Sequence, residues 1–102
     1  MPGDSPLVNG QPLGALVQRV VADVLVLAIE DVQPGKALIR DLGAESIDFM
    51  DLVFHLEDAL GTRIPFTRWQ RFVEANLAGR DPVAAITPEF LQAFAEEELA
   101  RL

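Results

Sequence analysis

Hydrophobic positions recur at helical spacing over residues 46–60. At about 100° per residue, one side of this segment collects apolar residues at i, i+3, i+4, i+7 and i+11, which is typical of a stripe that packs into a core: Phe49, Leu52, Val53, Leu56 and Leu60. Ser46 is a preferred N-cap residue, and a carboxylate in the first turn favours a helix. The pattern therefore predicts a helix that begins at Ser46.

A second apolar stripe lies on the other side of the same helix, roughly 145° from the first. It consists of three residues: Ile47, Met50 and Phe54. Four carboxylates border it or lie further round: Asp48, Asp51, Glu57 and Asp58. Exposed apolar groups ringed by one sign of charge predict a docking face for a basic partner. The alternative is that another helix of the chain covers this stripe.

Two further helices are expected on either side of this one. A helical stripe of apolar residues ending at Ala28 predicts a helix over 12–30, with Pro12 suited to its first position. A short helix is expected over 67–78, with Thr67 as its cap. Its aromatic residue Trp69 is interpreted as core packing.

The last helix is expected over 88–100, because Thr87 can cap it and Pro88 fits its first position. Its apolar stripe is expected to run on to Leu102. Three consecutive carboxylates are interpreted as its solvated face: Glu96, Glu97 and Glu98.

The connecting segments are defined by glycine and proline. Residues 1–11 are expected to be a flexible lead, and residues 12–102 a single domain. A loop over 31–44 is expected to turn at Pro34-Gly35 and again at Gly43. Its apolar residues are expected to anchor it to the core: Leu38, Ile39 and Leu42.

The net charge of the chain limits the classes of molecule that it is expected to bind. The chain has 102 residues and a net charge of −8, which argues against nucleic acids and anionic membrane surfaces. Asp23 interrupts an apolar run that is too short to span a bilayer. Proteins with basic patches are the expected partners, and repulsion between acidic surfaces favours a monomer. Residues 1–11 lack the positive start of a signal peptide, so a cytoplasmic location is expected.

Catalytic and metal sites are not expected. Ser46 and His55 are nine residues apart, which places them about 13.5 Å apart along a helix, well beyond the ~3 Å reach of a nucleophile–base hydrogen bond. The chain has one histidine, no cysteine and no D-x-[DN]-x-[DN]-G loop, which leaves only diffuse binding of divalent cations to carboxylates. We expect a protein that serves other enzymes rather than one that catalyses a reaction itself.

The segment 38–65 resembles the acyl carrier protein family. The resemblance depends on Asp41-Leu42-Gly43, on Glu45-Ser46-Ile47-Asp48, on the acidic helix and on Ile64-Pro65. It implies an all-α, acyl-carrier-like bundle with three main helices and one short extra helix. It also implies that Ser46 carries 4′-phosphopantetheine, whose thiol holds acyl groups as thioesters. Glu45 stands where the family usually has Asp, which keeps the charge and adds a methylene.

The resemblance further implies which residues meet partner enzymes. The expected contact positions are Glu45, Ile47, Asp48, Met50, Asp51, Phe54, Glu57 and Asp58. The expected partners are a phosphopantetheinyl transferase and acyl-transferring or ketosynthase enzymes of fatty-acid, lipid or polyketide synthesis. Two alternatives stay open: a peptidyl or aminoacyl carrier of a nonribosomal pathway, and an unmodified helical adaptor. The acidic helix favours the fatty-acyl type.

Overall fold

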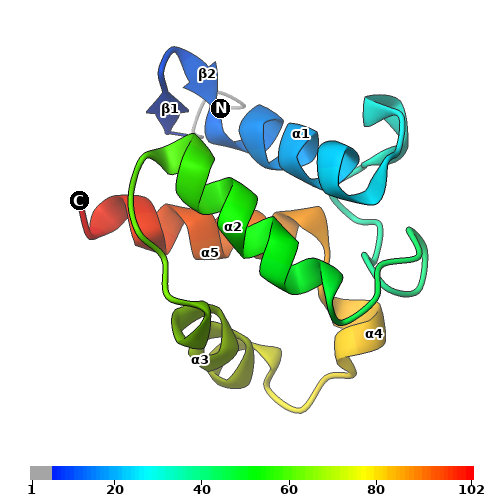
Figure 1. The fold of residues 1–102 in the computed structure, drawn as a ribbon. Coiled ribbons are helices and arrows are strands. Elements are labelled where there is room, and N and C mark those ends of the chain that lie inside the picture. The colour runs from blue at the N-terminus through cyan, green and yellow to red at the C-terminus, as the bar shows by residue number, and fades with distance from the viewer. Residues whose placement is uncertain (1–5) are drawn as a thin grey trace.

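The protein is a bundle of helices (Figure 1). A computed structural model describes residues 6–102. Within that range, four helices of 12 or 13 residues carry the fold: α1 (Leu13–Leu25), α2 (Asp48–Leu60), α3 (Phe66–Leu77) and α5 (Pro88–Ala100). Shorter elements join them: β1 (Leu7–Val8), β2 (Gln11–Pro12), the 3-10 turn η2 (Ile29–Asp31) and the one-turn helix α4 (Pro82–Ala85). The predicted all-α class is confirmed.

The core lies where α1, α2 and α5 meet. All five residues of the predicted core stripe of α2 are buried, which confirms that face. Leu13 and Val17 of α1 and Leu91 and Phe94 of α5 are fully buried beside them. Burying a large aliphatic or aromatic side chain contributes about 1.5–3 kcal/mol, so each of these buried residues stabilises the three-helix contact. None of the helices within residues 6–102 is long and apolar enough to cross a lipid bilayer.

An aromatic cluster attaches α3 to the other helices. The ring of Trp69 stacks on that of Phe49 in α2, with 5.8 Å between the ring centroids. It contacts Phe94 of α5 edge-to-face, with a centroid distance of 5.2 Å. Phe72 and Phe90 complete the cluster. These are the distances that aromatic pairs favour. Trp69 is only 4% exposed, so the prediction that it packs in the core is confirmed. The predicted short helix has 12 residues, one fewer than each of the other three.

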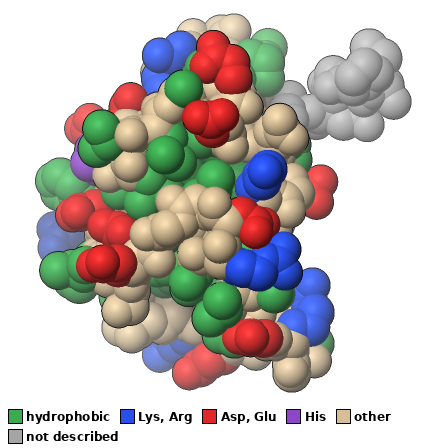
Figure 2. Space-filling view, turned by 90° about the vertical axis from the view of Figure 1, so that its right-hand side faces the viewer, with side chains coloured by type: hydrophobic (Ala, Val, Ile, Leu, Met, Phe, Trp, Pro, Cys, Tyr) green, Lys and Arg blue, Asp and Glu red, His purple; other side chains and the backbone are tan. Residues whose placement is uncertain are grey.

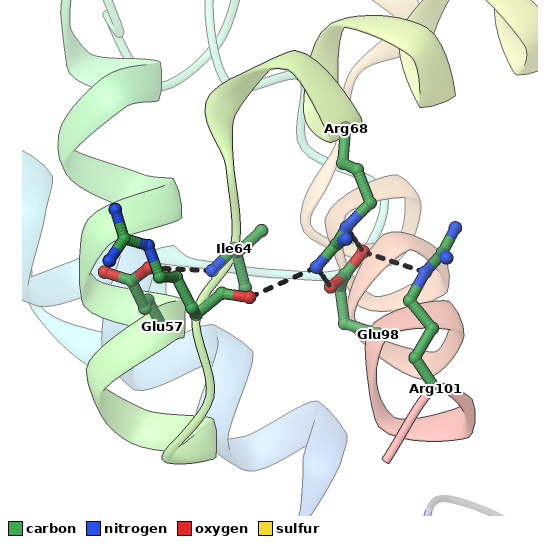
Figure 3. A network of polar contacts seen from close by, with 6 residues as sticks. Glu57, Ile64, Arg68, Glu98 and Arg101 are labelled. Carbon is green, nitrogen blue, oxygen red and sulfur yellow. Dashed lines mark hydrogen bonds and ion pairs between the residues drawn. The ribbon is translucent and has the colours of Figure 1, made fainter.

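A buried ion pair also attaches α3 to α5 (Figure 3). Glu98 is 2% exposed and accepts hydrogen bonds from Arg68 Nε at 3.0 Å and Nη2 at 2.9 Å. Arg101 approaches the same carboxylate at 3.4 Å. The prediction that Glu98 is solvated is therefore wrong, although Glu96 and Glu97 are exposed. A buried carboxylate needs such partners because desolvation of a charge is costly.

Part of the N-terminal lead has regular structure. Strands β1 and β2 pair as an antiparallel hairpin, with Leu7 opposite Pro12 and Val8 opposite Gln11. Asn9 (φ 52°) and Gly10 (φ 83°) form the turn, and positive φ at both positions is the type I′ geometry that favours Asn-Gly. Part of the segment expected as a flexible lead is therefore a β-hairpin. Residues 1–5 lie outside the described part of the chain.

Several helix ends differ from their predicted positions. The first helix ends at Leu25 rather than at residue 30, because Val26 takes the left-handed conformation at φ 56°. Ala28 is consequently exposed. Helix α3 begins at Phe66, so Thr67 does not cap it. Leu102 lies beyond the end of α5 and is 72% exposed. The start of α5 is confirmed: the hydroxyl of Thr87 accepts from the N–H of Phe90 at 3.1 Å.

Candidate functional site

The loop before α2 is held by backbone hydrogen bonds to the α4 region. Leu38 donates to the carbonyl of Ile86 at 2.8 Å, and Arg40 donates to that of Val83 at 3.2 Å. Leu38 is fully buried, as the sequence predicted. A loop attached to the core in this way presents the residues that follow it in a defined place. Figure 1 shows α4 close to the start of α2.

Asp41 organises the turn within this loop. Its carboxylate accepts from the N–H of Ala37 at 2.9 Å and from the guanidinium of Arg40 at 3.1 Å. The hydrogen bond from Arg40, followed by that from Ala37, lowers the pKa of Asp41 below its ordinary value of 3.8. Gly43 then takes a φ of 78°, which favours glycine. The predicted turn at Gly43 is therefore present.

Ser46 lies just before α2 rather than at its N-cap. The helix begins at Asp48, and Ile47 occupies the N-cap position without a side-chain cap. Instead, the carboxylate of Asp48 reaches back and accepts from the N–H of Glu45 at 2.8 Å, as in half of a capping box. The predicted cap role of Ser46 is wrong. The carboxylate of Asp48, two residues after Ser46, forms the hydrogen bond in this turn, and the serine hydroxyl stays free.

The Ser46 side chain is exposed. Within residues 6–102 its hydroxyl makes no hydrogen bond, and the N–H groups of Ser46 and Ile47 have no acceptor. Exposed N–H groups at the start of a helix favour an anion. The site therefore offers an accessible hydroxyl beside two free donors.

The second apolar stripe of α2 faces solvent. Ile47 is 67% exposed, Met50 57% and Phe54 64%. Another helix of the described chain does not cover them, so the alternative of a purely structural stripe is wrong. Figure 2 views the end of the molecule at which α2 begins, and red and green side chains lie next to one another on its left-hand side.

The carboxylates around this stripe differ in their contacts. Asp51 and Asp58 are exposed. Glu57 is half-buried, and its Oε2 accepts from the N–H of Ile64 at 2.7 Å (Figure 3). Asp48 is half-buried and bonded to Glu45. Two of the predicted partner-binding carboxylates thus also hold the two ends of α2 in place, a role that the sequence pattern did not indicate.

His55 is exposed. Its Nδ1 lies 2.8 Å from the backbone carbonyl oxygen of Asp51, so this nitrogen carries the hydrogen. Its ring has no link to Ser46 within residues 6–102. Across the same range, no group of three or more His, Cys, Asp or Glu side chains is placed to hold a metal ion.

An open groove of about 670 Å³ runs from Ser46 along α3. Its apolar walls come from Phe49, Phe66, Trp69, Val73 and Ile86, and its polar edge from Thr67, Gln70, Arg71 and Glu74. Sequence reasoning did not identify this groove, because its lining residues come from the start of α2, from α3 and from Ile86 after α4, which are far apart in the sequence.

Comparison with known proteins agrees with this geometry. The phosphopantetheine attachment site family matches residues 15–69, which is more than half of the chain and includes Ser46. A relative in Mesorhizobium japonicum, named acyl carrier protein AcpXL, is 32% identical over 65 residues, which cover 64% of this chain and 70% of the relative.

Two further relatives carry the same name. Those of Brucella melitensis and Rhizobium meliloti are each 33% identical over 57 residues, or 56% of this chain. The chain spans about three-fifths of the length of these two relatives, at 61% and 60%. The helical fold, the matched residues and these likenesses agree. The chain belongs to the acyl carrier protein family, whose cofactor is a covalently bound 4′-phosphopantetheine.

Proposed function

We propose that Ser46 is the attachment residue and that the chain carries acyl groups for enzymes of fatty-acid, lipid or polyketide synthesis. The observation that carries this proposal is the exposed, unbonded hydroxyl of Ser46 inside the segment that the family matches. Thr62 and Thr67 are the nearest other hydroxyls along the chain, and neither follows an Asp-Leu-Gly turn.

The residues around Ser46 fit the cofactor. When bound, the arm supplies a thiol that holds the acyl group as a thioester. The free N–H groups of Ser46 and Ile47 suit a phosphodiester oxygen. Solvent exposure gives a transferase access to the hydroxyl. Within residues 6–102 no side chain is hydrogen-bonded to the Ser46 hydroxyl. We expect the transferase to take the proton when the serine oxygen bonds to the pantetheine-bearing phosphorus of coenzyme A and adenosine 3′,5′-bisphosphate leaves.

The exposed stripe of α2 is the proposed partner face. Its apolar residues supply the contact area, namely Ile47, Met50 and Phe54. The exposed carboxylates of Glu45, Asp51 and Asp58 attract basic patches and raise association rates. Such contacts are weak enough to release quickly, which suits a carrier that visits several enzymes. Glu57 and Asp48 add negative charge at the edge of the face.

The chemical nature of the group on the arm distinguishes an acyl carrier from a peptidyl or aminoacyl carrier. Peptidyl carriers also hold their cargo on phosphopantetheine, and the names of the relatives favour an acyl carrier. We propose a test in which the protein is isolated from its native cells and its cargo is released by thioester cleavage. Fatty or polyketide acyl groups identified by mass spectrometry would support the proposal. Aminoacyl or peptidyl groups would overturn it.

A further inference from the structure

The groove beside Ser46 is poor in positive charge. An arm attached to Ser46 places a phosphodiester next to the exposed Glu45 and the half-buried Asp48. Helix α2 has no Lys or Arg. Among the described residues that line the groove, Arg71 is the one cation, and Glu74 lies one turn further along α3. A phosphodiester at this position therefore lacks a counter-charge unless Arg71 provides it.

Arg71 differs from the other arginines of this region. Arg68 is committed to the buried Glu98, and Arg80 donates to the carbonyls of Leu77 and Asn76 at the end of α3. Arg71 is exposed, and it makes no hydrogen bond or ion pair within residues 6–102. A guanidinium left without a partner at the edge of a groove is available to a ligand.

The position of Arg71 allows it to reach this groove. It lies on the outer ridge of α3, one turn after Thr67, and the two residues line both the Ser46 groove and a second groove between α3 and α5. The ridge itself is fixed, because Trp69 is buried in the aromatic cluster and Arg68 is paired with Glu98. A long side chain on a fixed ridge can turn toward an anion held near Ser46.

We propose that Arg71 is a positioning residue for the arm on Ser46, to which it binds through the phosphodiester oxygens. This inference rests on the proposed function of Ser46. The planar guanidinium matches the geometry of a phosphate group, and attachment to the same protein raises the effective concentration of the arm at the groove. An exposed ion pair is weak and is screened by salt, so Arg71 holds the arm along α3 between encounters and still releases it to a partner enzyme.

The test measures the mobility of the arm in the holo-protein. An ¹⁵N-labelled arm is transferred from labelled coenzyme A to unlabelled protein, and the ¹H–¹⁵N heteronuclear NOE of the two arm amides is recorded. In the wild type we expect NOE values clearly above those of a free chain at low salt, and a decrease toward free-chain values as salt is added. In Arg71→Gln we expect values near those of a free chain at every salt concentration, whereas Arg71→Lys retains part of the order.

Arg19→Gln is the matched control, since it removes the same charge from an exposed position on α1. We expect it to behave as the wild type. Equal arm mobility in the wild type and Arg71→Gln, or an equal loss of order in Arg19→Gln, would overturn the proposal. Mass spectrometry of each sample precedes the measurement: an arm absent from Ser46 in the wild type contradicts the proposed function, and an arm present but unaffected by Arg71 contradicts this inference alone.

Discussion

At the scale of single residues, the site depends on which side chains form hydrogen bonds and which stay free. Asp48 satisfies the turn through Glu45, so the hydroxyl of Ser46 is not used as a cap. The sequence correctly places Ser46 close to the start of a helix, but it does not show that the cap position falls on Ile47, without a side-chain cap. Serine is a preferred N-cap residue, and only the backbone geometry shows that Ser46 lies one residue before that position.

The pKa of Asp41 provides the first prediction. Arg40 lowers it in the folded state, so the charged form of Asp41 stabilises the turn at pH values above the ordinary 3.8. This contribution is lost as the pH falls through the lower, folded pKa. In Arg40→Gln we expect the carboxyl to titrate closer to 3.8, which NMR of the Asp41 carboxyl carbon can measure. An unchanged midpoint would show that Arg40 does not hold the turn.

Val26 provides the second prediction. It is 88% exposed and adopts φ 56° at the end of α1, a conformation that is unfavourable for a β-branched residue. The left-handed region costs roughly 1–2 kcal/mol for a non-glycine residue. Glycine avoids this cost in the folded protein, but its greater conformational freedom stabilises the unfolded chain and offsets part of the gain. Val26→Gly should raise the free energy of unfolding by about 0.5–1 kcal/mol in urea denaturation. A decrease would mean that Val26 makes a stabilising contact.

At the scale of elements, α2 is the helix that the sequence describes best. A helix in a bundle usually has one apolar face, and the second stripe predicted an exposed surface that the structure confirms. Helix α3 was less predictable. Its burial depends on Phe90 and Phe94 and on Glu98, which lies 30 residues from Arg68. A local sequence pattern cannot predict an ion pair between residues so far apart. Because Glu98 follows Glu96 and Glu97, it was predicted to be solvated as they are.

The stripe on α2 provides the third prediction. Phe54→Ala should lower kcat/KM for modification by a broad-specificity transferase by about tenfold, because loss of a central aromatic contact costs more than ~1 kcal/mol. Leu7→Ala is the control, since Leu7 is 68% exposed and lies on the N-terminal hairpin rather than on α2. Circular dichroism should show both variants folded. Equal kinetics for the two would mean that Phe54 does not contact the transferase.

The ion pair between α3 and α5 provides the fourth prediction. Glu98→Ala should lower the free energy of unfolding by about 1–3 kcal/mol, because Arg68 and Arg101 lose a charged acceptor. Arg68 is 32% exposed and can regain water, which keeps the loss moderate. The double variant Arg68→Met with Glu98→Leu should be closer to the wild type, since apolar packing can replace a buried pair. Equal losses in the two proteins would indicate that the charges themselves are needed.

At the scale of the whole molecule, the periodicity of apolar residues predicts the helices and the acidic face of α2. Features that depend on contacts between distant residues, such as the groove, are not predicted. The hairpin was not predicted, although Asn9-Gly10 is a strong turn signal. The proline and glycine content of the lead indicates a flexible segment instead. The groove beside Ser46 combines α2, α3 and the end of α4, so it exists only in the folded chain. The acidic, exposed face of α2 and the groove meet at Ser46, which is the arrangement expected of a carrier.

The most direct measurement is peptide-mapped mass spectrometry after incubation with coenzyme A and a broad-specificity phosphopantetheinyl transferase. We expect one added 4′-phosphopantetheine in the wild type, located on the peptide that contains Ser46, and none in Ser46→Ala. Thr67→Ala removes another hydroxyl that lines the same groove and should be modified as the wild type is. Modification of Ser46→Ala to the same extent, or an unmodified wild type, would contradict the account.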